Sequence, residues 1–476
     1  MSFAKIYTRG LLGLHAPQIE VEVHISSGLP SLTIVGLPEA AVRESKDRVR
    51  SAIINSGFLF PTKRLTINLA PADLPKDGSR LDLPIALGIL IASGQLPENC
   101  TDGFEFIGEL ALDGHLRPVS GTLTIAMACQ QARHRLLLPT ANLDEASQLP
   151  EFEVYAASHL QQVCAHFLGN SLLKAAPQKS MAASSRYPFD LADVKGQLRP
   201  RRALEIAAAG GHSLLFKGPP GTGKTLLASR LPSILPPLNA QENLEVASIY
   251  SVANAQHTFG QRPFRAPHHT ASAIALVGGG SQPKPGEITL AHLGVLFLDE
   301  LPEFDRKVLE VLRQPLESKE IVISRAARQM TFPANFQFIA AMNPCPCGYA
   351  FNQDSRCQCS PESIQRYQNR ISGPLLDRID LHIDVPPLQA NELQERTPSE
   401  NSETVRQRVM KAYQQQIQRQ QCLNQALSPT LLEQYACLDD SSSKIIEMAQ
   451  QRLNLSARAY HRVLRVARTI ADLAES

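Results

Sequence analysis

The chain has 476 residues, of which 43% are hydrophobic, and its formal net charge is +2 with an isoelectric point near 8.1. This length is too great for one ordinary core, so two or three globular domains are expected. The near-neutral charge excludes a broad cationic surface, and any nucleic-acid contact must come from local clusters. Because no apolar run approaches the ~20 residues that span a bilayer and the first residues lack a signal-peptide pattern, we expect a cytoplasmic protein with no membrane partner.

The first part of the chain, residues 1–168, alternates short apolar strands with helices and predicts an independent α+β domain. A stretch rich in Ala, Ser, Lys and Gln within 169–188 shows little amphipathic pattern, which indicates an interdomain linker. The clearest predicted elements of the first domain are strands at 20–25, 32–36 and 64–69 and a helix at 84–93.

From 189 to 387, strands and helices recur in the order typical of a P-loop α/β domain. A glycine-rich stretch follows the apolar run 214–216 and matches the full pattern G-x-x-x-x-G-K-[ST]. Such glycines let backbone N–H groups surround phosphate oxygens, so we predict an ATP site at which Lys224 neutralises charge and Thr225 binds Mg²⁺. A glycine-rich turn that contains Lys-Thr by chance is the alternative. The predicted nucleotide-binding residues of this stretch are Gly218, Pro219, Pro220, Gly221, Thr222, Gly223, Lys224 and Thr225.

A second motif is the run 294–298, a glycine and four apolar residues, which ends in Asp299 and Glu300. It predicts a buried parallel strand whose carboxyl end meets the nucleotide. Asp299 would orient Mg²⁺ and its waters, and Glu300 would polarise the attacking water. An acidic strand end that caps the following helix is the alternative.

Four of the nine cysteines form two C-x-C pairs separated by nine residues. Four thiolates brought to one point are the ligands of a structural zinc ion, so a zinc-binding insertion is predicted at 345–359. Free thiols or a redox pair are the alternatives. The other five cysteines stand alone and are expected as small core residues. The predicted zinc ligands are Cys345, Cys347, Cys357 and Cys359.

Residues 388–476 are predicted to be helical and polar. In the last helix, apolar residues recur at steps of four, three, four and three, which predicts a single apolar face. These residues are Ala459, Val463, Val466, Ile470 and Leu473.

Three further segments resemble functional segments of AAA+ ATPases. Asn343 closes an apolar strand like sensor 1, Arg378 lies in a segment similar to the arginine finger, and Arg458 lies in a helix similar to sensor 2. The resemblance implies that Asn343 positions the lytic water, Arg378 reaches the γ-phosphate in the neighbouring subunit, and Arg458 contacts the phosphates. The alternatives for Arg378 are an internal ion pair with Asp377 or Asp380, or a finger at Arg366 or Arg370.

Together the motifs closely resemble the magnesium-chelatase-like AAA+ family over essentially the whole chain. The resemblance implies an AAA+ P-loop α/β domain at 189–387 and a helical lid at 388–476, assembled into a homo-oligomeric, hexameric ring. One branch of the family is understood as DNA helicases that promote branch migration during recombination in natural transformation, with DNA and recombination proteins as partners. A metal-chelatase motor subunit or another protein remodeller is the alternative. The motifs are DVKGQ, GPPGTGKT, RAPHHTAS, GGGSQPKPGE, GVLFLDELPEF, AAMNPCPCG, GPLLDRIDLH and SARAYHRVLRVARTIADL.

The first domain resembles the Lon protease domain, a ribosomal-S5-like α+β fold. Proteolysis there would need a serine nucleophile activated by a lysine. Residues 80–82 occupy the region of the nucleophile and 122–125 the place of the lysine, while Ser79 stands nearby without its base. We therefore expect a domain without peptidase activity that serves ring assembly or DNA handling.

Two loops of the ATPase domain are candidates for the lining of a central pore. Residues 320–332 are predicted as strand, turn and strand, with Arg325 and Arg328 at the turn, and the loop at 278–286 carries Lys284. Cationic side chains at loop tips suit phosphate contacts that do not depend on sequence. A solvated turn explains the two arginines equally well.

Overall fold

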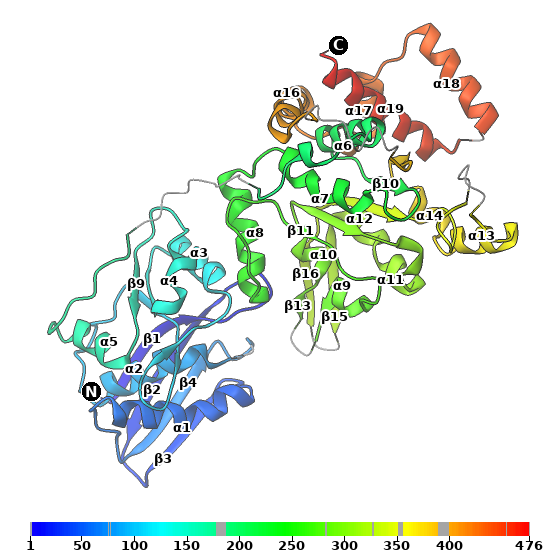
Figure 1. Ribbon diagram of the computed structural model, residues 1–476. Coiled ribbons are helices and arrows are strands. Elements are labelled where there is room, and N and C mark those ends of the chain that lie inside the picture. The colour runs from blue at the N-terminus through cyan, green and yellow to red at the C-terminus, as the bar shows by residue number, and fades with distance from the viewer. Residues whose placement is uncertain are drawn as a thin grey trace. The chain divides into compact units, whose positions relative to one another are not determined.

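The computed structural model describes residues 2–74, 76, 78–177, 187–280, 283–325, 328–350, 356–388, 399–453 and 455–475. The chain forms two compact units, one of Met1–Ala182 with Leu244–Gln256 and the other of Ala183–Asn243 with His257–Ser476 (Figure 1). Most of helix α8 (Ala240–Ala253) therefore belongs to the first unit although it lies within the predicted ATPase segment. Within the described ranges, no helix is both long and apolar enough to cross a membrane.

The first unit is built on a mixed seven-stranded sheet of order β3-β4-β2-β1-β5-β8-β9. Strand β2 pairs antiparallel with both β1 and β4, and the remaining neighbours are parallel. Along β4, buried residues alternate with more exposed ones, as expected when one face of a sheet is covered. The predicted strands at 20–25, 32–36 and 64–69 are confirmed as β2, β3 and β4. The strands are β1 (Phe3–Arg9), β2 (Gln18–Ser26), β3 (Ser31–Val35), β4 (Arg64–Ala70), β5 (Phe104–Phe106), β8 (Arg135–Pro139) and β9 (Val154–Ala157), with a separate pair β6 (Glu109–Leu110) and β7 (Leu116–Arg117).

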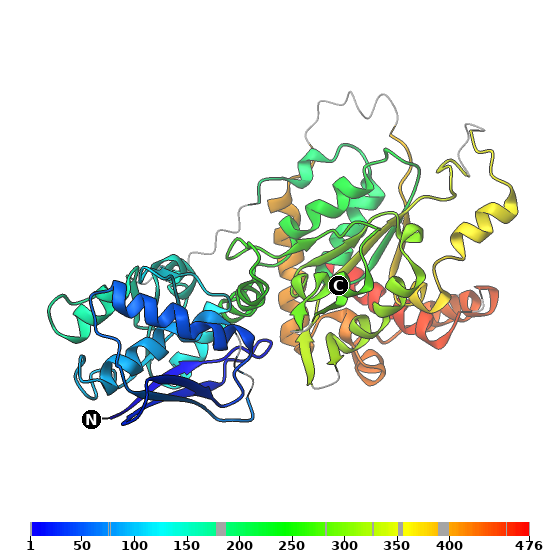
Figure 2. The same cartoon turned by 90° about the horizontal axis from the view of Figure 1, so that it is seen from below.

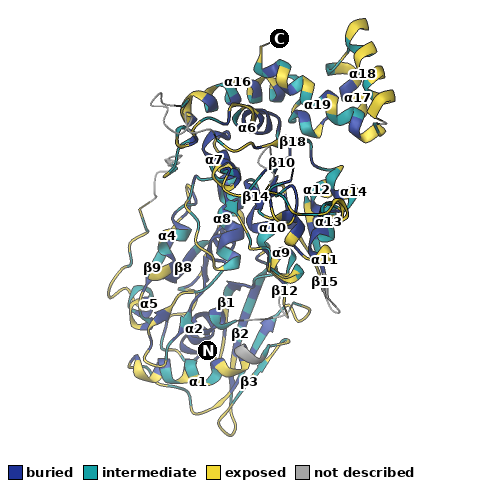
Figure 3. Ribbon diagram, turned by 45° about the vertical axis from the view of Figure 1, so that its right-hand side comes forward, coloured by how far each residue is buried: buried dark blue, intermediate teal, exposed yellow. Residues whose placement is uncertain are grey.

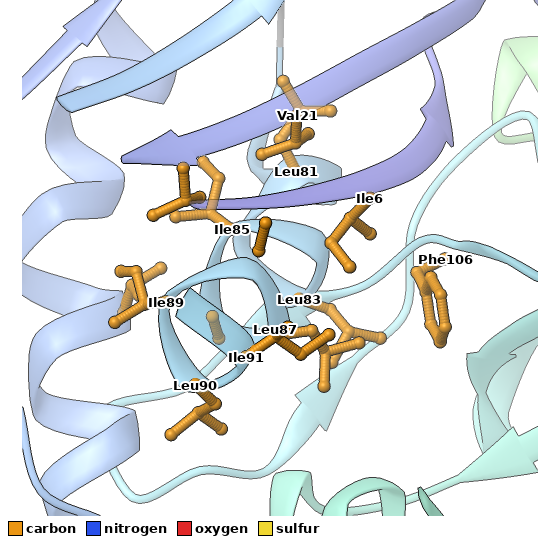
Figure 4. Close-up of a cluster of buried hydrophobic side chains, with 14 of the residues drawn as sticks. Ile6, Val21, Leu81, Leu83, Ile85, Leu87, Ile89, Leu90, Ile91 and Phe106 are labelled. Carbon is orange, nitrogen blue, oxygen red and sulfur yellow. The ribbon is translucent and has the colours of Figure 1, made fainter. Parts of the chain in front are cut away.

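Helix α2 (Asp82–Ala92) lies at the centre of the core of this unit and confirms the helix predicted at 84–93. All of its residues are buried, and its apolar side chains point outward on every side (Figure 4). A helix that is apolar all round is stable only when it is surrounded by other elements. At Gly88 a Cβ atom would lie 2.7 Å from Val23 Cγ2, so the helix and strand β2 approach as closely as glycine allows. The other helices are α1 (Ala40–Asn55), η1 (Ser79–Leu81), α3 (Thr122–Gln131), η2 (Thr140–Asn142), α4 (Leu143–Ala146) and α5 (Leu160–Phe167).

The second unit contains a five-stranded parallel sheet of order β11-β14-β17-β10-β18, with helices on both faces (Figure 2). All four residues of β14 are buried, which is expected for a parallel strand covered on both sides. The strands are β10 (Leu214–Lys217), β11 (Phe264–Arg265), β14 (Val295–Leu298), β17 (Gln337–Met342) and β18 (Leu381–Asp384). The helices are η3 (Leu191–Asp193), α6 (Leu198–Gly210), α7 (Lys224–Ile234), α9 (Ala273–Val277), α10 (Glu287–Leu290), η4 (Leu301–Glu303), α11 (Arg306–Val311), α12 (Arg313–Ser318), α13 (Pro361–Gln368) and α14 (Gly373–Leu376).

The described residues after 399 are mainly helical, in α16 (Ser402–Gln420), η5 (Asn424–Ala426), α17 (Pro429–Tyr435), α18 (Asp440–Leu453) and α19 (Ala457–Leu473). Helix α18 has no buried residue within 440–453 and is largely exposed (Figure 3).

The predicted apolar face of the last helix is wrong in part. Val463 and Ile470 are 43% and 41% exposed, whereas Thr469 and Asp472 of α19 are buried. The polar pair is buried because it is hydrogen-bonded: Asn424 donates to both side chains, and Arg419 donates to Asp472.

Truncation of the central helix tests the core of the first unit. The variant Leu87→Ala leaves a cavity among buried side chains and should lower the free energy of unfolding of this unit by about 2–5 kcal/mol. Hydrogen exchange of the amides in β1, β2 and β4 reports the change. Leu59→Ala is the control, because Leu59 is 80% exposed and its truncation should leave the exchange almost unchanged.

Candidate nucleotide-binding site

The order of the parallel strands brings three sequence motifs to one edge of the sheet. Strand β17 lies between β14 and β10, with Leu298 opposite Ala340 and Phe216 opposite Ala341. The glycine-rich loop follows β10, Asp299 follows β14, and Asn343 follows β17. In an open parallel sheet, ligands bind outside the carboxyl ends of the strands. The motifs therefore converge where such a fold binds its ligand.

The glycine-rich loop has the backbone of a phosphate cradle. Gly221 and Gly223 have φ angles of 78° and 86°, a region that favours glycine, and helix α7 begins at the next residue. At Gly218 a Cβ atom would lie 2.2 Å from the carbonyl oxygen of Val385, so only glycine fits beside the end of β18. The side chain of Gln197, in the DVKGQ motif, donates to the carbonyl oxygens of Thr222 and Pro386 and so links the loop to the chain that follows β18.

Lys224 links this loop to the neighbouring strand. Its ammonium group donates to the carbonyl oxygens of Gly218 and Pro219, both at 2.7 Å, and to Asn343 Oδ1 at 3.2 Å. Burial lowers the pKa of Lys224, although Asp299 and Glu300 act in the opposite direction. A buried cation with only neutral acceptors in the loop is suited to an anion such as a phosphate group.

The side chains of Thr225 and Asp299 lie together as a pair of oxygen ligands. Thr225 Oγ1 donates to Asp299 Oδ2 at 2.5 Å, and the other carboxylate oxygen accepts from the backbone N–H of Glu300 at 2.9 Å. Hydroxyl and carboxylate oxygens suit Mg²⁺, which favours few protein ligands alongside phosphate and water. These two residues fit a nucleotide-bound Mg²⁺.

Glu300 has a partner that the sequence analysis did not identify. His269 Nδ1 lies 3.1 Å from Glu300 Oε2, and the His268 ring lies 4.1 Å from the ring of His269, centroid to centroid. Glu300 also has a φ angle of 50°, which is uncommon for a residue with a side chain. The signal in the sequence was the motif RAPHHTAS, but no spacing rule connects it to residue 300.

The two predicted arginines meet at one carboxylate. Arg378 Nη2 and Arg458 Nη2 lie 2.6 and 2.7 Å from the same oxygen of Glu317, Oε1, in helix α12. An ion pair between Arg378 and Asp380 was one alternative to the arginine finger. Asp380 does not form it, and instead accepts hydrogen bonds from the backbone N–H and the hydroxyl group of Ser213. Arg370, the alternative finger, pairs with Glu303 at 2.9 Å.

The four clustered cysteines form a compact group. Their sulfur atoms all lie within 4.8 Å of one another, with Cys345 to Cys357 at 3.8 Å and Cys347 to Cys357 at 3.6 Å. Zinc–sulfur bonds of about 2.3 Å in a tetrahedron place the sulfur atoms about 3.8 Å apart. Cys345 Sγ also accepts from the backbone N–H of Ala350 at 3.2 Å, a contact that stabilises a thiolate. The donor set and its spacing fit a zinc ion.

The predicted pore loops are two antiparallel hairpins, β12 (Gly278–Gly279) with β13 (Lys284–Pro285), and β15 (Glu320–Arg325) with β16 (Arg328–Pro333). They are neighbours, because a Cβ atom on Gly278 would lie 3.1 Å from Ile323 Cδ1 (Figure 1). Lys284 is exposed. Arg325 and Arg328 form the last pair of the β15–β16 register, and their side chains lie outside the described part of the structure.

In the first unit, the Ser79 hydroxyl donates to a carboxylate oxygen of Glu109. Within the described residues the hydroxyl thus contacts a carboxylate, whereas a serine–lysine peptidase would need a lysine at this serine.

Sequence comparison agrees with this architecture. Three family profiles match successive parts of the chain: "Subunit ChlI of Mg-chelatase" at 21–142, "Magnesium chelatase, subunit ChlI" at 190–393, and "Magnesium chelatase, subunit ChlI C-terminal" at 399–476. Together with the site, they define a multidomain α/β protein with a magnesium-chelatase domain of the AAA+ type.

Full-length relatives specify the family further. The chain is 50% identical over 477 residues to "Uncharacterized protein YifB" of Salmonella typhimurium, covering 99% of this chain and 94% of the relative. It is also 50% identical over 481 residues to "Competence protein ComM" of Haemophilus influenzae, with the same coverage. "Magnesium-chelatase 38 kDa subunit" of Cereibacter sphaeroides is 25% identical over 177 residues, 33% of this chain and 53% of that protein. The chain belongs to the magnesium-chelatase-like family that contains YifB and ComM.

Removal of the buried cation tests the nucleotide site. Lys224→Ala should weaken the binding of Mg²⁺-ATP by about 1.5–3 kcal/mol, roughly ten- to 150-fold, because a charge-assisted contact to phosphate is lost. Equilibrium titration with a fluorescent ATP analogue measures the change. Lys307→Ala, which removes an exposed cation of helix α11, should bind ATP as the unaltered protein does. Equal affinity in both variants would contradict the assignment.

Proposed function

We propose that this protein is a Mg²⁺-dependent ATPase that assembles into a ring and moves DNA through its centre, as a cytoplasmic helicase that promotes branch migration. The observation that carries the proposal is the convergence of four side chains at one edge of the sheet, those of Lys224, Thr225, Asp299 and Asn343. The chain that carries them is 50% identical in sequence to a competence protein. The family indicates ATPase activity. Coupling of hydrolysis to DNA during recombination is the further step proposed.

Each side chain has a distinct role in hydrolysis under this proposal. The glycine-rich loop and Lys224 bind the β- and γ-phosphates, and Thr225 and Asp299 hold the metal. Mg²⁺ supplies charge that neutralises the phosphate oxygens. Glu300 orients the attacking water after its carboxylate leaves His269, and Asn343 fixes that water from the neighbouring strand.

The arginines support a ring with shared sites. Arg378 and Arg458 occupy one carboxylate oxygen of Glu317, so the two cations already lie close enough to act on one anion. We assign Arg378 to the γ-phosphate of the adjacent subunit and Arg458 to the phosphates, where they stabilise developing charge. In the assembled ring, phosphate would replace the carboxylate of Glu317 as their partner.

The neighbouring hairpins supply the DNA contact. Lys284 on β13, with Arg325 and Arg328 on β15 and β16, would bind phosphates without regard to sequence. The first unit, which we assign to a Lon-like fold without peptidase activity, would serve ring assembly or DNA handling. Recombination proteins are the partners expected of such a helicase.

Two further assignments complete the proposal. The four clustered cysteines hold a structural zinc ion, because their sulfur spacing fits tetrahedral coordination.

A metal-chelatase motor is the second candidate function, favoured by the resemblance to a magnesium-chelatase subunit. That resemblance covers only a third of this chain, so we rank it below the helicase.

Steady-state ATP hydrolysis with and without single-stranded DNA tests the function. We expect DNA to stimulate turnover, and Glu300→Gln should lower kcat by roughly 10²–10⁴-fold while ATP binding persists, because the water loses its activating carboxylate. Hydrolysis that is indifferent to DNA would favour the chelatase motor. Rapid hydrolysis by Glu300→Gln would refute the role of Glu300.

The salt dependence of DNA binding tests the hairpins. If Lys284 contacts one phosphate of a single strand, Lys284→Ala should make the negative slope of log K against log salt shallower by about 0.7 and weaken binding equally for all sequences. Fluorescence anisotropy of a labelled oligonucleotide measures both effects. Lys307→Ala serves as the matched loss of charge, and an identical slope in the two variants would place the DNA contact elsewhere.

A further inference from the structure

The turn at residues 345–348, which carries Cys345 and Cys347 and is called the cysteine turn below, lies directly against the ATP-binding loop. Gly348, one residue after Cys347, is buried and has a φ angle of 85°. A Cβ atom there would lie 2.6 Å from Pro220 Cδ and 3.1 Å from Pro220 Cγ. Pro220 is the third residue of the glycine-rich loop. The cysteine turn therefore packs directly against the glycine-rich loop.

The chain that enters the turn is also attached to the loop. Gly218 donates its backbone N–H to the carbonyl oxygen of Met342 at 3.2 Å, and Lys224 donates to Asn343 at 3.2 Å. Two residues later the chain reaches Cys345, which is fully buried. With the Gly348 contact, three points of the segment 342–348 touch the glycine-rich loop or its lysine.

The far side of the cysteine group is held by the chain that leaves it. Cys359 is followed by Ser360, which caps helix α13, and Gln368 of that helix donates to the carbonyl oxygen of Pro344 at 3.0 Å. The two cysteine pairs, at 345–347 and 357–359, thus lie side by side. A metal ion bound by both pairs would cross-link these two segments and so fix the position of the turn.

We propose that zinc bound by the four thiolates supports the ATP-binding loop, so that the metal centre and the nucleotide site are energetically coupled. This inference rests on the zinc assignment above and adds a regulatory consequence. Loss of zinc releases the turn at Gly348 from Pro220 and weakens ATP binding. Coupling free energies are reciprocal, so bound ATP must tighten zinc by the same factor.

The first experiment removes zinc from the folded protein and restores it. Metal analysis should give about one zinc per chain. In the Glu300→Gln background with excess Mg²⁺, the zinc-free protein should bind a fluorescent ATP analogue about 5- to 150-fold more weakly, and added zinc should restore the affinity. Transfer of zinc to the chromophoric chelator 4-(2-pyridylazo)resorcinol should be slower or less complete when the ATP analogue is bound. Neither readout involves DNA, so a failed helicase assay leaves this test intact.

Two variants separate the metal from the contact. Cys357→Ser with Cys359→Ser should lose both zinc and ATP affinity, whereas Cys437→Ser removes a lone exposed thiol and should change neither. Gly348→Ala retains all four thiols but places a methyl group against Pro220, so it should keep zinc and bind ATP more weakly.

The outcomes distinguish the two proposals. Protein that holds no zinc, even after reconstitution, overturns both the zinc assignment and the coupling. Protein that loses and regains zinc with unchanged ATP affinity overturns the coupling alone. Unchanged affinity in Gly348→Ala would show that the contact with Pro220 does not transmit the effect and would also overturn the mechanism.

Discussion

The nucleotide site depends on the parallel pairing of β10, β14 and β17. Parallel neighbours end at the same edge of the sheet, so the segments that follow these strands must meet whatever their separation along the chain. The contacts across this edge are short and polar, from Lys224 to Asn343 and from Thr225 to Asp299. A shift of one residue in the pairing of β17 with β10 would invert its side chains and separate Asn343 from Lys224.

The same edge connects the site to other parts of the second unit. His269 holds Glu300, and it precedes helix α9 and the hairpin β12–β13, which carries Lys284. The Arg265–Glu287 ion pair, with two contacts of 2.7 Å, closes the base of this segment. In the proposed function, a DNA contact at the hairpin and His269, the partner of the carboxylate that activates water, thus lie on one closed segment, which offers a physical route between binding and hydrolysis.

Local sequence patterns predicted the elements well where one residue type controls the backbone. The glycine-rich loop, the buried strand β14 and the hairpin β15–β16 all lie where glycine, apolar runs and a turn place them. The apolar face of α19 was less predictable, because Asp472 is buried by partners on α16 and η5 that no helical period reveals. The assignment of α8 to the first unit could not be predicted either, since most of its residues belong to that unit although they lie within the ATPase segment of the sequence.

The sequence by itself determined the chemistry available: a phosphate loop, paired acids, four thiols and several arginines, each defined by residue type and short spacing. The tertiary structure decided which of these act together. Only the fold places Glu317 between Arg378 and Arg458, His269 beside Glu300, and Gly348 against Pro220. These contacts join residues far apart in the chain, and their distances depend on strand order and helix packing, which no local pattern encodes.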